Sequence, residues 1–305
     1  MHDANVMTAR DLGAGHRLLR GALAMLAVLA LVAGCATTAE TIQPVTPPGP
    51  PTKYSALVID AANGETLYQS NATAARYPAS LTKMMTLYLL FEALDQGRVS
   101  KTTELPVSAF AARQPPSKIG LKPGQSIDVE HAILALAVKS GNDCAVAVAE
   151  YLGGSEEQFA QQMTARARQL GMTGTVFRNA SGLPDPEQRT TARDMAVLGM
   201  ALRSRFPQHF HYFSEREFTF RGRLVRGHND MIGRVEGVDG IKTGYIKASG
   251  YNVVTSVSRG SRRLIVVVMG ADSARARNAH VEVLIEKYMR KPEPDGLLSS
   301  LSLFD

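Results

Sequence analysis

The sequence predicts an α+β protein in which an antiparallel sheet is flanked by helices and a helical subdomain is inserted between strands of that sheet. Two observations support this class. Strand patterns occur near both ends of the chain, and the long middle of the chain has the apolar spacing of helices. The 305 residues are 45% hydrophobic and 20% charged, which is the composition of an ordinary globular protein with ample apolar material for a core.

Residues 1–34 are expected to form an export signal rather than part of the folded domain. Arg17 and Arg20 precede an uncharged run that is too short to span a bilayer comfortably but has the length of a secretory signal. The run closes with Val32-Ala-Gly-Cys35, which resembles a bacterial lipobox. That resemblance implies that Cys35 is acylated and becomes the N-terminus of a lipoprotein. A simple signal peptide or a short membrane anchor is the alternative.

Residues 35–52 are rich in proline and threonine and cannot bury a core, so we expect an extended tether. In a polyproline-like conformation, at about 3.1 Å per residue, it reaches roughly 50 Å from the membrane. The expected location is the periplasmic face of a bacterial membrane, and Ala36 after the lipobox cysteine favours the outer membrane in a Gram-negative cell. Cys144 is the only other cysteine, which leaves an acylated protein no intramolecular disulfide.

Residues 53–290 are predicted to be the folded domain, and residues 291–305 a short C-terminal tail. The domain opens with a β-hairpin over residues 55–60 and 65–69, because the turn signal Asn63-Gly64 lies between them. Apolar residues at helical spacing then predict helices over residues 80–95, 129–137, 143–152, 156–170 and 191–204. Later patterns predict strands over residues 217–220, 223–225, 250–258 and 264–269, and a final helix over 274–289.

A serine and a lysine lie three residues apart at the start of the first predicted helix. Ser80 and Lys83 share one helix face, so the lysine amine can approach the serine hydroxyl. The spacing alone is common, and an N-capping serine beside a solvated lysine would produce it. The residues after Lys83 are strongly apolar, beginning with Met84 and Met85, which favours a partly desolvated amine.

Two more short motifs follow along the chain. Ser140-Gly-Asn142 interrupts two apolar helical stretches, where a helix break with capping side chains is the ordinary explanation. Lys242-Thr243-Gly244 leads into a strand, and a glycine there lets a ligand approach the backbone closely, although an edge lysine before a bulge would have the same pattern. Each motif is weak by itself, but the order S-x-x-K, S-x-N, K-T-G is a strong signature.

In this order the three motifs resemble the serine penicillin-recognising enzymes, and the finer match is to the low-molecular-mass D-alanyl-D-alanine carboxypeptidases. The stretches that carry the resemblance are Tyr77-Pro-Ala-Ser-Leu-Thr-Lys-Met-Met-Thr86, Ser140-Gly-Asn-Asp-Cys-Ala-Val-Ala-Val-Ala-Glu150 and Val238-Asp-Gly-Ile-Lys-Thr-Gly-Tyr245. The resemblance to this family extends over residues 54–289. The resemblance implies a β-lactamase/penicillin-binding-protein-like fold and a D,D-peptidase catalytic domain.

The resemblance implies that Ser80 is the nucleophile. An alcohol needs a base, and no G-x-S-x-G motif brings a histidine to it, so Lys83 is expected to take the proton. Burial and repulsion from Lys242 would keep the Lys83 amine neutral by lowering its pKa. Ser140 would relay the proton to the leaving amine, and Asn142 would hold either the substrate amide or Lys83.

The implied substrate-binding residues are Lys242, Thr243, Gly244, Tyr245 and Arg277. Lys242 and Thr243 would bind the free carboxylate of the terminal D-alanine. The backbone N–H groups of Ser80 and Tyr245 would form the oxyanion hole. Arg277 falls at the family position for a carboxylate-binding arginine, but Arg275 lies close by in the same run and is an alternative.

The implied reaction removes the terminal D-alanine from peptidoglycan stem pentapeptides through an acyl-enzyme on Ser80, with no cofactor and with β-lactam antibiotics as covalent inhibitors. A D,D-endopeptidase that cuts peptidoglycan cross-links is an alternative, and so is a non-hydrolytic penicillin-binding sensor lipoprotein. A β-lactamase is disfavoured, because residues 171–183 hold no glutamate to activate a deacylating water.

Other function classes find little support in the sequence. The net charge of +6 is mild, and no basic run accompanies it, which disfavours nucleic-acid binding. The seven histidines form no H-E-x-x-H motif, so no metal site is expected. The tail has no basic amphipathic face, and we therefore expect the membrane anchor at Cys35.

Overall fold

The computed structural model describes residues 52–289. The predicted signal peptide, Cys35, the tether up to residue 51 and the tail lie outside the described residues, so those expectations stay predictions. Between residues 52 and 289, no helix has the length and apolar character that crossing a bilayer requires.

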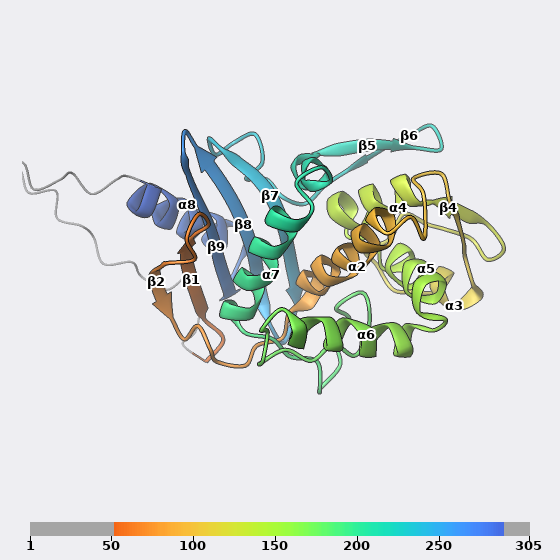
Figure 1. Ribbon diagram of the computed structural model, residues 1–305, viewed down its shortest axis with the longest axis horizontal. Helices are drawn as coiled ribbons and strands as arrows, with labels where there is room; N and C mark the ends of the chain where they lie inside the picture. Colours follow the sequence, from red (N-terminus) through yellow and green to blue (C-terminus); the bar gives the residue numbers. More distant parts are fainter. Residues whose placement is uncertain (1–51, 290–305) are drawn as a thin grey trace, which may run out of the picture. The chain divides into compact units, whose positions relative to one another are not determined.

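A five-stranded antiparallel sheet organises the described domain (Figure 1). Its spatial order is β2-β1-β9-β8-β7. The strands are β1 (Ser55–Asp60), β2 (Thr66–Ser70), β7 (Val238–Ile246), β8 (Gly250–Arg259) and β9 (Arg262–Ala271). Strand β1 pairs with β9, so the two ends of the domain join in one sheet and the residues between β2 and β7 are an insertion. The predicted α+β class is therefore confirmed.

Alternating side chains build a core on each face of this sheet. In β1, Ala56 and Val58 belong to the core on one face, whereas Leu57 and Ile59 belong to the core on the other. The first face packs against α8 (Ala274–Met289), and the second packs against α7 (Ala192–Arg205) and the inserted helices. Figure 1 shows α8 and α7 on opposite sides of the sheet. Strands β8 and β9 are covered on both faces and are therefore almost entirely buried.

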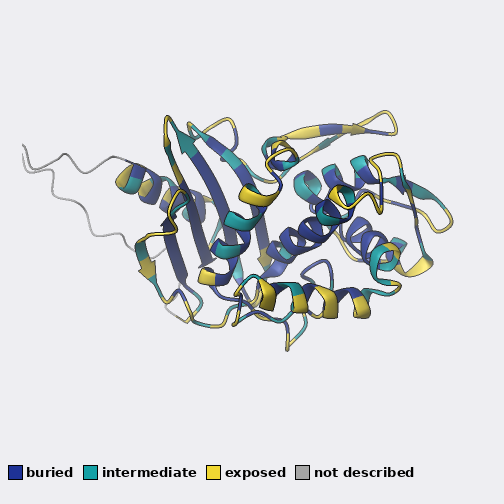
Figure 2. Cartoon of the chain, viewed as in Figure 1, coloured by how far each residue is buried: buried dark blue, intermediate teal, exposed yellow. Residues whose placement is uncertain are grey.

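The inserted helices surround one central helix. They are α2 (Lys83–Asp95), α3 (Ala109–Ala112), α4 (Val129–Leu134), α5 (Asn142–Gly153) and α6 (Glu156–Gln169). Every residue of α2 from Lys83 to Phe91 is buried, and Figure 2 shows this helix dark along most of its length. A helix that is apolar on all sides is stable only when other elements cover it. Lys83 is consequently carried into the interior by the helix to which it belongs.

Local geometry departs from the predicted helices at two of the motifs. Residues Ala79–Thr82 form a 3₁₀ turn before α2, so the helix predicted over residues 80–95 begins with a tighter turn. Helix α4 continues into a π-helical turn, Ala135–Lys139, which ends at Ser140 in the left-handed conformation (φ 63°, ψ 38°). Such π turns occur often at functional sites, because they redirect the residue that follows.

The predicted hairpin over residues 217–225 is present as β5 (Glu217–Phe220) and β6 (Arg223–Arg226). Short elements without a periodic pattern were not predicted: α3, β3 (Glu104–Pro106), β4 (Ser126–Asp128) and the 3₁₀ helix η4 (Phe210–Ser214). These elements have three to five residues, which are too few to show a helical or strand period. The other predicted elements agree with the structure to within about two residues at each end.

Candidate active site

Ser80 lies in the 3₁₀ turn that leads into α2. The residue before it, Ala79, has a left-handed backbone (φ 49°), which is strained for a residue with a side chain. Asn252 of β8 ties this turn to the sheet, because its side-chain amide donates to the carbonyl oxygens of Tyr77 and Pro78 at 3.1 and 3.3 Å. Tertiary contacts with the sheet therefore hold the Ser80 turn in place.

The Lys83 amine is enclosed by three oxygen atoms. Its Nζ donates to Asn142 Oδ1 at 2.7 Å and to the carbonyl oxygen of Ser181 at 2.5 Å, and it lies 3.3 Å from Ser80 Oγ. The residue has no exposed surface. Two of the three oxygens are amide carbonyls, which can only accept hydrogen bonds, whereas the serine hydroxyl can also donate one.

Burial lowers the pKa of Lys83 well below its ordinary value, and repulsion from Lys242 lowers it further. A neutral amine has two hydrogens and one lone pair. The two hydrogens match the carbonyls of Asn142 and Ser181, which leaves the lone pair for the Ser80 hydroxyl. The arrangement can therefore accept a proton from Ser80 without breaking either carbonyl hydrogen bond.

The S-x-N motif lies where the π turn meets α5. Ser140 is buried, lines the same pocket as Ser80, and its hydroxyl has no hydrogen-bond partner among residues 52–289. Asn142 uses Oδ1 for Lys83 and donates from Nδ2 to the carbonyl of Pro115 at 2.8 Å. Of its two expected partners, the substrate amide or Lys83, the side chain contacts Lys83. The free Ser140 hydroxyl remains available to a ligand.

Strand β7 forms the opposite wall and is the strand at one edge of the five-stranded sheet. A Cβ atom added at Gly244 would lie 3.0 Å from the backbone nitrogen of Ser80 and 3.2 Å from that of Leu81. A side chain at this position would press on the backbone of the serine turn, so the absence of one in glycine favours this close approach of β7. Thr243 and Tyr245, on either side of Gly244, line the pocket with Ser80.

Two buried cations lie at one end of this wall. Burial lowers the pKa of Lys242 to about 7, with Arg277 adding repulsion, and its Nζ donates to the carbonyl oxygen of Thr243 at 3.0 Å. Burial lowers the pKa of Arg277 to about 10, so its guanidinium stays charged at neutral pH. Arg277 lines the pocket from α8, whereas Arg275 is exposed and does not line it. Arg277 is therefore the arginine placed to bind an anion there.

The structure gathers the sequence-predicted site residues around one pocket of about 540 Å³. The pocket is lined by Ser80, Ser140, Asn142, Thr243, Gly244, Tyr245 and Arg277. Lys83 lies behind this lining and reaches Ser80 and Asn142, while Lys242 reaches Thr243. Within residues 52–289, no group of three or more His, Cys, Asp and Glu side chains is placed to hold a metal ion.

Sequence reasoning missed several residues that shape the pocket. Ser181 holds Lys83 through its carbonyl oxygen, and Asn252 holds the serine turn. Asp143 is fully buried and accepts hydrogen bonds from the backbone N–H groups of residues 119–121 at 2.9–3.3 Å. His228 and Asp230 line the pocket from the loop before β7. A polar residue inside an apolar run, as at Asn252, was the signal available, since such groups need partners when buried.

Gly182 packs against the backbone of the serine turn and offers a direct test of that contact. It has φ +85°, and a Cβ atom there would lie 1.8 Å from the carbonyl oxygen of Ala79. Gly182→Ala is expected to lower the free energy of unfolding by about 2–4 kcal/mol, since it adds a clash to backbone strain. Chemical denaturation measures this loss.

Gly171→Ala is the matched control for that substitution. Gly171 has φ +84° but no atom within 4 Å of an added Cβ, so it carries the backbone strain without the clash. A loss of about 1 kcal/mol is expected there. Equal losses at both positions would mean that the contact between Gly182 and the serine turn contributes nothing.

Glu156, the first residue of α6, contacts the loop that precedes Gly182. Its Oε1 accepts a hydrogen bond from the backbone N–H of Ala180 at 3.0 Å, and burial raises its pKa. Glu156 lines a separate hollow with Phe110 and Arg178, not the pocket that holds Ser80. The geometry thus gives no carboxylate from this loop to activate a water beside Ser80.

Comparison with known proteins places this site in a family. Residues 45–273 match the D-alanyl-D-alanine carboxypeptidase family. The chain is 38% identical over 236 residues to the D-alanyl-D-alanine carboxypeptidase DacC of Escherichia coli strain K12, covering 75% of this chain and 59% of the relative. It spans 59–61% of the length of the curated relatives from Bacillus subtilis and Escherichia coli that it matches.

Solved structures agree with the sequence matches. Penicillin-binding protein 5 of Haemophilus influenzae superposes with a TM-score of 0.75 at 34% identity, covering 79% of this chain and 72% of that one. Penicillin-binding protein D2 of Listeria monocytogenes, in its cefotaxime-bound form, superposes with a TM-score of 0.72 at 30% identity. The match covers 78% of this chain and 98% of that one. Because the family match extends over most of the described domain and includes the Ser80, Ser140 and Lys242 motifs, the chain belongs to the D-alanyl-D-alanine carboxypeptidase family.

Proposed function

We propose that this chain is a serine-type D,D-carboxypeptidase that removes the terminal D-alanine from peptidoglycan stem pentapeptides. The observation that carries the proposal is the enclosed Lys83 amine. Its two carbonyl partners, on Asn142 and Ser181, leave its lone pair for Ser80 Oγ at 3.3 Å. His228 lines the same pocket, but among residues 52–289 the side-chain partner of the Ser80 hydroxyl is Lys83, and a buried, neutral lysine can serve as the base that a hydroxyl nucleophile needs.

In the proposed acylation step, Ser80 Oγ attacks the carbonyl carbon of the penultimate D-alanine while Lys83 takes its proton. The backbone N–H groups of Ser80 and Tyr245 would stabilise the oxyanion, and the close approach of β7 to the serine turn at Gly244 supports this assignment. The C–N bond then breaks, and the leaving amine takes a proton relayed through Ser140. Water hydrolyses the resulting ester and restores Ser80.

The carboxylate of the leaving D-alanine is expected at the Lys242 end of the pocket. Lys242, Thr243 and Arg277 supply two cationic groups and a hydroxyl there. A β-lactam carries a carboxylate near its reactive amide, so the same groups support covalent inhibition by penicillins. A relative from Listeria monocytogenes has been solved with cefotaxime bound, which supports this part of the proposal.

Binding of a carboxylate-ended peptide is expected to weaken as pH rises through about 7. The pKa of Lys242 is lowered to about 7, so its ammonium group is present below that pH and is lost above it. A charge-assisted hydrogen bond contributes enough that KM should rise roughly tenfold between pH 6.5 and 8.5. Steady-state kinetics on the free acid and on the C-terminal amide of one peptide measure this; a parallel rise for both would contradict it.

We further propose that the protein is exported and anchored by a lipid at Cys35, facing the periplasm from the outer membrane if the cell is Gram-negative. Arg17, Arg20 and the lipobox-like sequence that ends at Cys35 support this proposal. Several acyl chains at one residue give stable anchoring where a single chain does not. The tether after Cys35 would then hold the domain away from the bilayer.

Cys35→Ala is expected to release the protein from the membrane or to leave its signal uncleaved, because the acylated thiol is removed. Metabolic labelling with a fatty acid, followed by membrane fractionation, measures both effects. Cys144→Ala is the matched control, since that thiol is fully buried in the domain. Unchanged lipid labelling in the Cys35 variant would rule out the lipoprotein proposal.

The direct test of the proposed activity uses the full chain in detergent with pentapeptide muropeptide monomers, and mass spectrometry identifies the products. Loss of one D-alanine per monomer is the expected result. A protein that becomes covalently labelled by penicillin but leaves the pentapeptide intact would instead be a non-hydrolytic sensor, and the proposal would be wrong.

A further inference from the structure

The loop of residues 179–183 lies against the face of α2 that carries the Lys83 amine. Lys83 Nζ donates to the carbonyl oxygen of Ser181 at 2.5 Å, and Thr86 Oγ1 donates to the carbonyl oxygen of Ala180 at 2.7 Å. Lys83 and Thr86 are three residues apart and therefore share one helix face. Two successive carbonyl groups of the loop are thus held by two side chains of α2.

A single side chain, that of Asn179, holds the other end of both peptide groups. The carbonyl of Ala180 shares its peptide group with the N–H of Ser181, and the carbonyl of Ser181 shares its own with the N–H of Gly182. Asn179 Oδ1 accepts hydrogen bonds from these two N–H groups at 3.3 and 2.7 Å. The peptide group that touches Lys83 is therefore fixed at its carbonyl end by the lysine and at its N–H end by Asn179.

The Asn179 side chain is itself held in one orientation. Its Nδ2 donates to the carbonyl oxygen of Leu183 at 3.1 Å. A backbone N–H can only donate and a carbonyl oxygen can only accept, so the amide fits its partners one way round. Gln188, which is buried, also donates to the Leu183 carbonyl at 3.2 Å and accepts from the N–H of Asn179 at 3.4 Å. The loop is thus closed by two amide side chains.

The Ser181–Gly182 peptide group has a second orientation that glycine makes accessible. Rotation of this group changes φ of Gly182, which is +85°, and a glycine adopts φ of either sign at little cost. In the rotated state the N–H, and not the carbonyl, faces the Lys83 amine. The lone pair of a neutral amine would accept that hydrogen and would no longer be available to Ser80.

We propose that Asn179 is a positioning residue for the reaction. By fixing the orientation of the Ser181–Gly182 peptide group, it keeps the lone pair of the Lys83 amine directed at Ser80. Asn179 does not line the active-site pocket, so it acts through the loop and not on the substrate. This inference rests on the proposed function, since it takes Lys83 as the base.

Asn179→Asp separates this role from simple stabilisation of the loop. A carboxylate accepts the same two N–H hydrogen bonds, and the Leu183 carbonyl keeps Gln188 as its donor. The added negative charge, one peptide group away from Lys83, favours the ammonium form and raises the pKa of that lysine. Because the base must be neutral, the acid limb of the acylation rate should move upward by about one pH unit. The other ionisable groups that act on Lys83 are unchanged in this variant: Lys242, Asp143, Cys144 and Glu156.

The test measures acylation of the full chain in detergent by a fluorescent penicillin, at several concentrations and over a range of pH. In Asn179→Ala the rate constant at saturation should fall about ten- to a hundredfold, the usual cost of a misplaced catalytic group. The half-saturating concentration should stay within about twofold, since Asn179 does not line the pocket. In Asn179→Asp the rate constant should return to the wild-type value above the shifted acid limb.

Asn63→Ala is the matched control. Asn63 is exposed in the turn between β1 and β2, outside the active-site pocket, and its Oδ1 also accepts a backbone hydrogen bond, from the N–H of Glu65 at 2.9 Å. This variant loses a similar contact and should acylate at the wild-type rate. Melting temperatures of all three variants report whether each is folded.

Slower acylation in Asn179→Ala at an unchanged half-saturating concentration, with recovery at high pH in Asn179→Asp, supports the inference. A folded Asn179→Ala that acylates within about threefold of the wild-type rate overturns it, and so do equal losses in both variants at every pH. If Asn179→Ala does not fold, the Asp variant decides, and an unshifted acid limb contradicts the inference. A wild-type chain that penicillin does not label removes the proposed function and the inference together.

Discussion

Ser80→Ala is expected to abolish D-alanine release and covalent labelling by penicillin. In the proposed reaction this hydroxyl forms the acyl-enzyme, and removing the nucleophilic serine of a hydrolase costs on the order of a million-fold in kcat. The fold should be unaffected, since the recorded side-chain hydrogen bond of Ser80 is the 3.3 Å contact with Lys83. Fluorescent penicillin labelling, seen on a denaturing gel, and mass spectrometry of the peptide products measure the two losses.

Ser117→Ala is the matched control for this prediction. Ser117 lines the same pocket, but its hydroxyl donates a hydrogen bond to the carbonyl oxygen of Lys139 at 2.8 Å. That hydroxyl therefore has a structural partner within the protein. Its removal should leave labelling and peptide cleavage within a few-fold of the wild-type values. Full penicillin labelling of the Ser80 variant would show that another residue is the nucleophile.

Lys83→Met has the second largest expected effect. Methionine is similar in length and apolar, so it fills the buried space but can neither accept a proton nor donate to the carbonyl oxygens on Asn142 and Ser181. The rate of acylation by penicillin should fall about a hundred- to ten-thousand-fold, the usual contribution of a general base. Stopped-flow or gel-based labelling at several penicillin concentrations gives the acylation rate constant.

The Lys83 variant should also be less stable, because two buried carbonyl oxygens lose their hydrogen-bond donor. The melting temperature of the variant shows whether it is still folded, so that a slower acylation can be assigned to the missing base. Lys139→Met is the matched control, as that lysine precedes the S-x-N motif without lining the active-site pocket. An acylation rate within tenfold of the wild-type rate, in a folded Lys83 variant, would mean that a different group takes the proton from Ser80.

The elements of the fold could be read from the sequence because their signals are local. Short apolar runs beside turn residues predicted β1, β8 and β9, and apolar residues at helical spacing predicted α2, α5, α6, α7 and α8. Strand patterns at both ends of the domain predicted one sheet built from both ends, and the structure supplied the pairing of β1 with β9. The π turn before Ser140 had no such signal, because its extra residue is accommodated by packing and not by a periodic pattern.

The sequence by itself determined which reactive groups the site contains and their order along the chain. The S-x-x-K, S-x-N and K-T-G motifs already identified Ser80, Lys83, Asn142 and Lys242. They also indicated a desolvated lysine, since Lys83 begins an apolar helix. The roles of these residues came from the resemblance of the three motifs, in this order, to the serine penicillin-recognising enzymes, and that resemblance is carried by short segments of the sequence.

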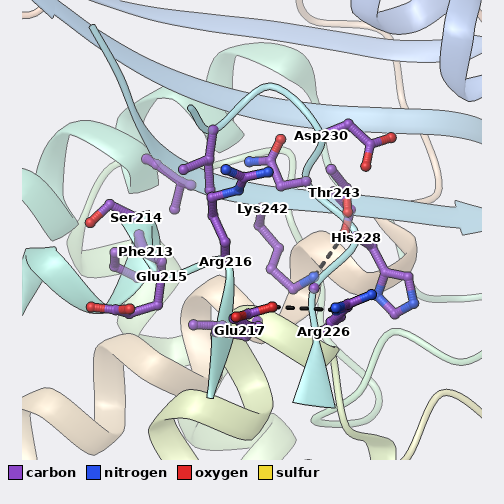
Figure 3. A pocket seen from close by; sticks show the side chains of 16 residues that line it. Phe213, Ser214, Glu215, Arg216, Glu217, Arg226, His228, Asp230, Lys242 and Thr243 are labelled. Carbon is purple, nitrogen blue, oxygen red and sulfur yellow. Dashed lines mark hydrogen bonds and ion pairs between the residues drawn. The ribbon is translucent and has the colours of Figure 1, made fainter. Parts of the chain in front are cut away.

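Only the tertiary structure decided what those groups contact. The carbonyl oxygen that holds Lys83 belongs to Ser181, 98 residues away, and the amide that ties the serine turn to the sheet belongs to Asn252, 175 residues from Tyr77. A second pocket, lined by residues of η4, the β5–β6 hairpin and β7, forms only where these elements meet (Figure 3). Hydrogen-bond partners, burial and pKa depend on neighbours brought from distant parts of the chain, so no short segment of the sequence contains them.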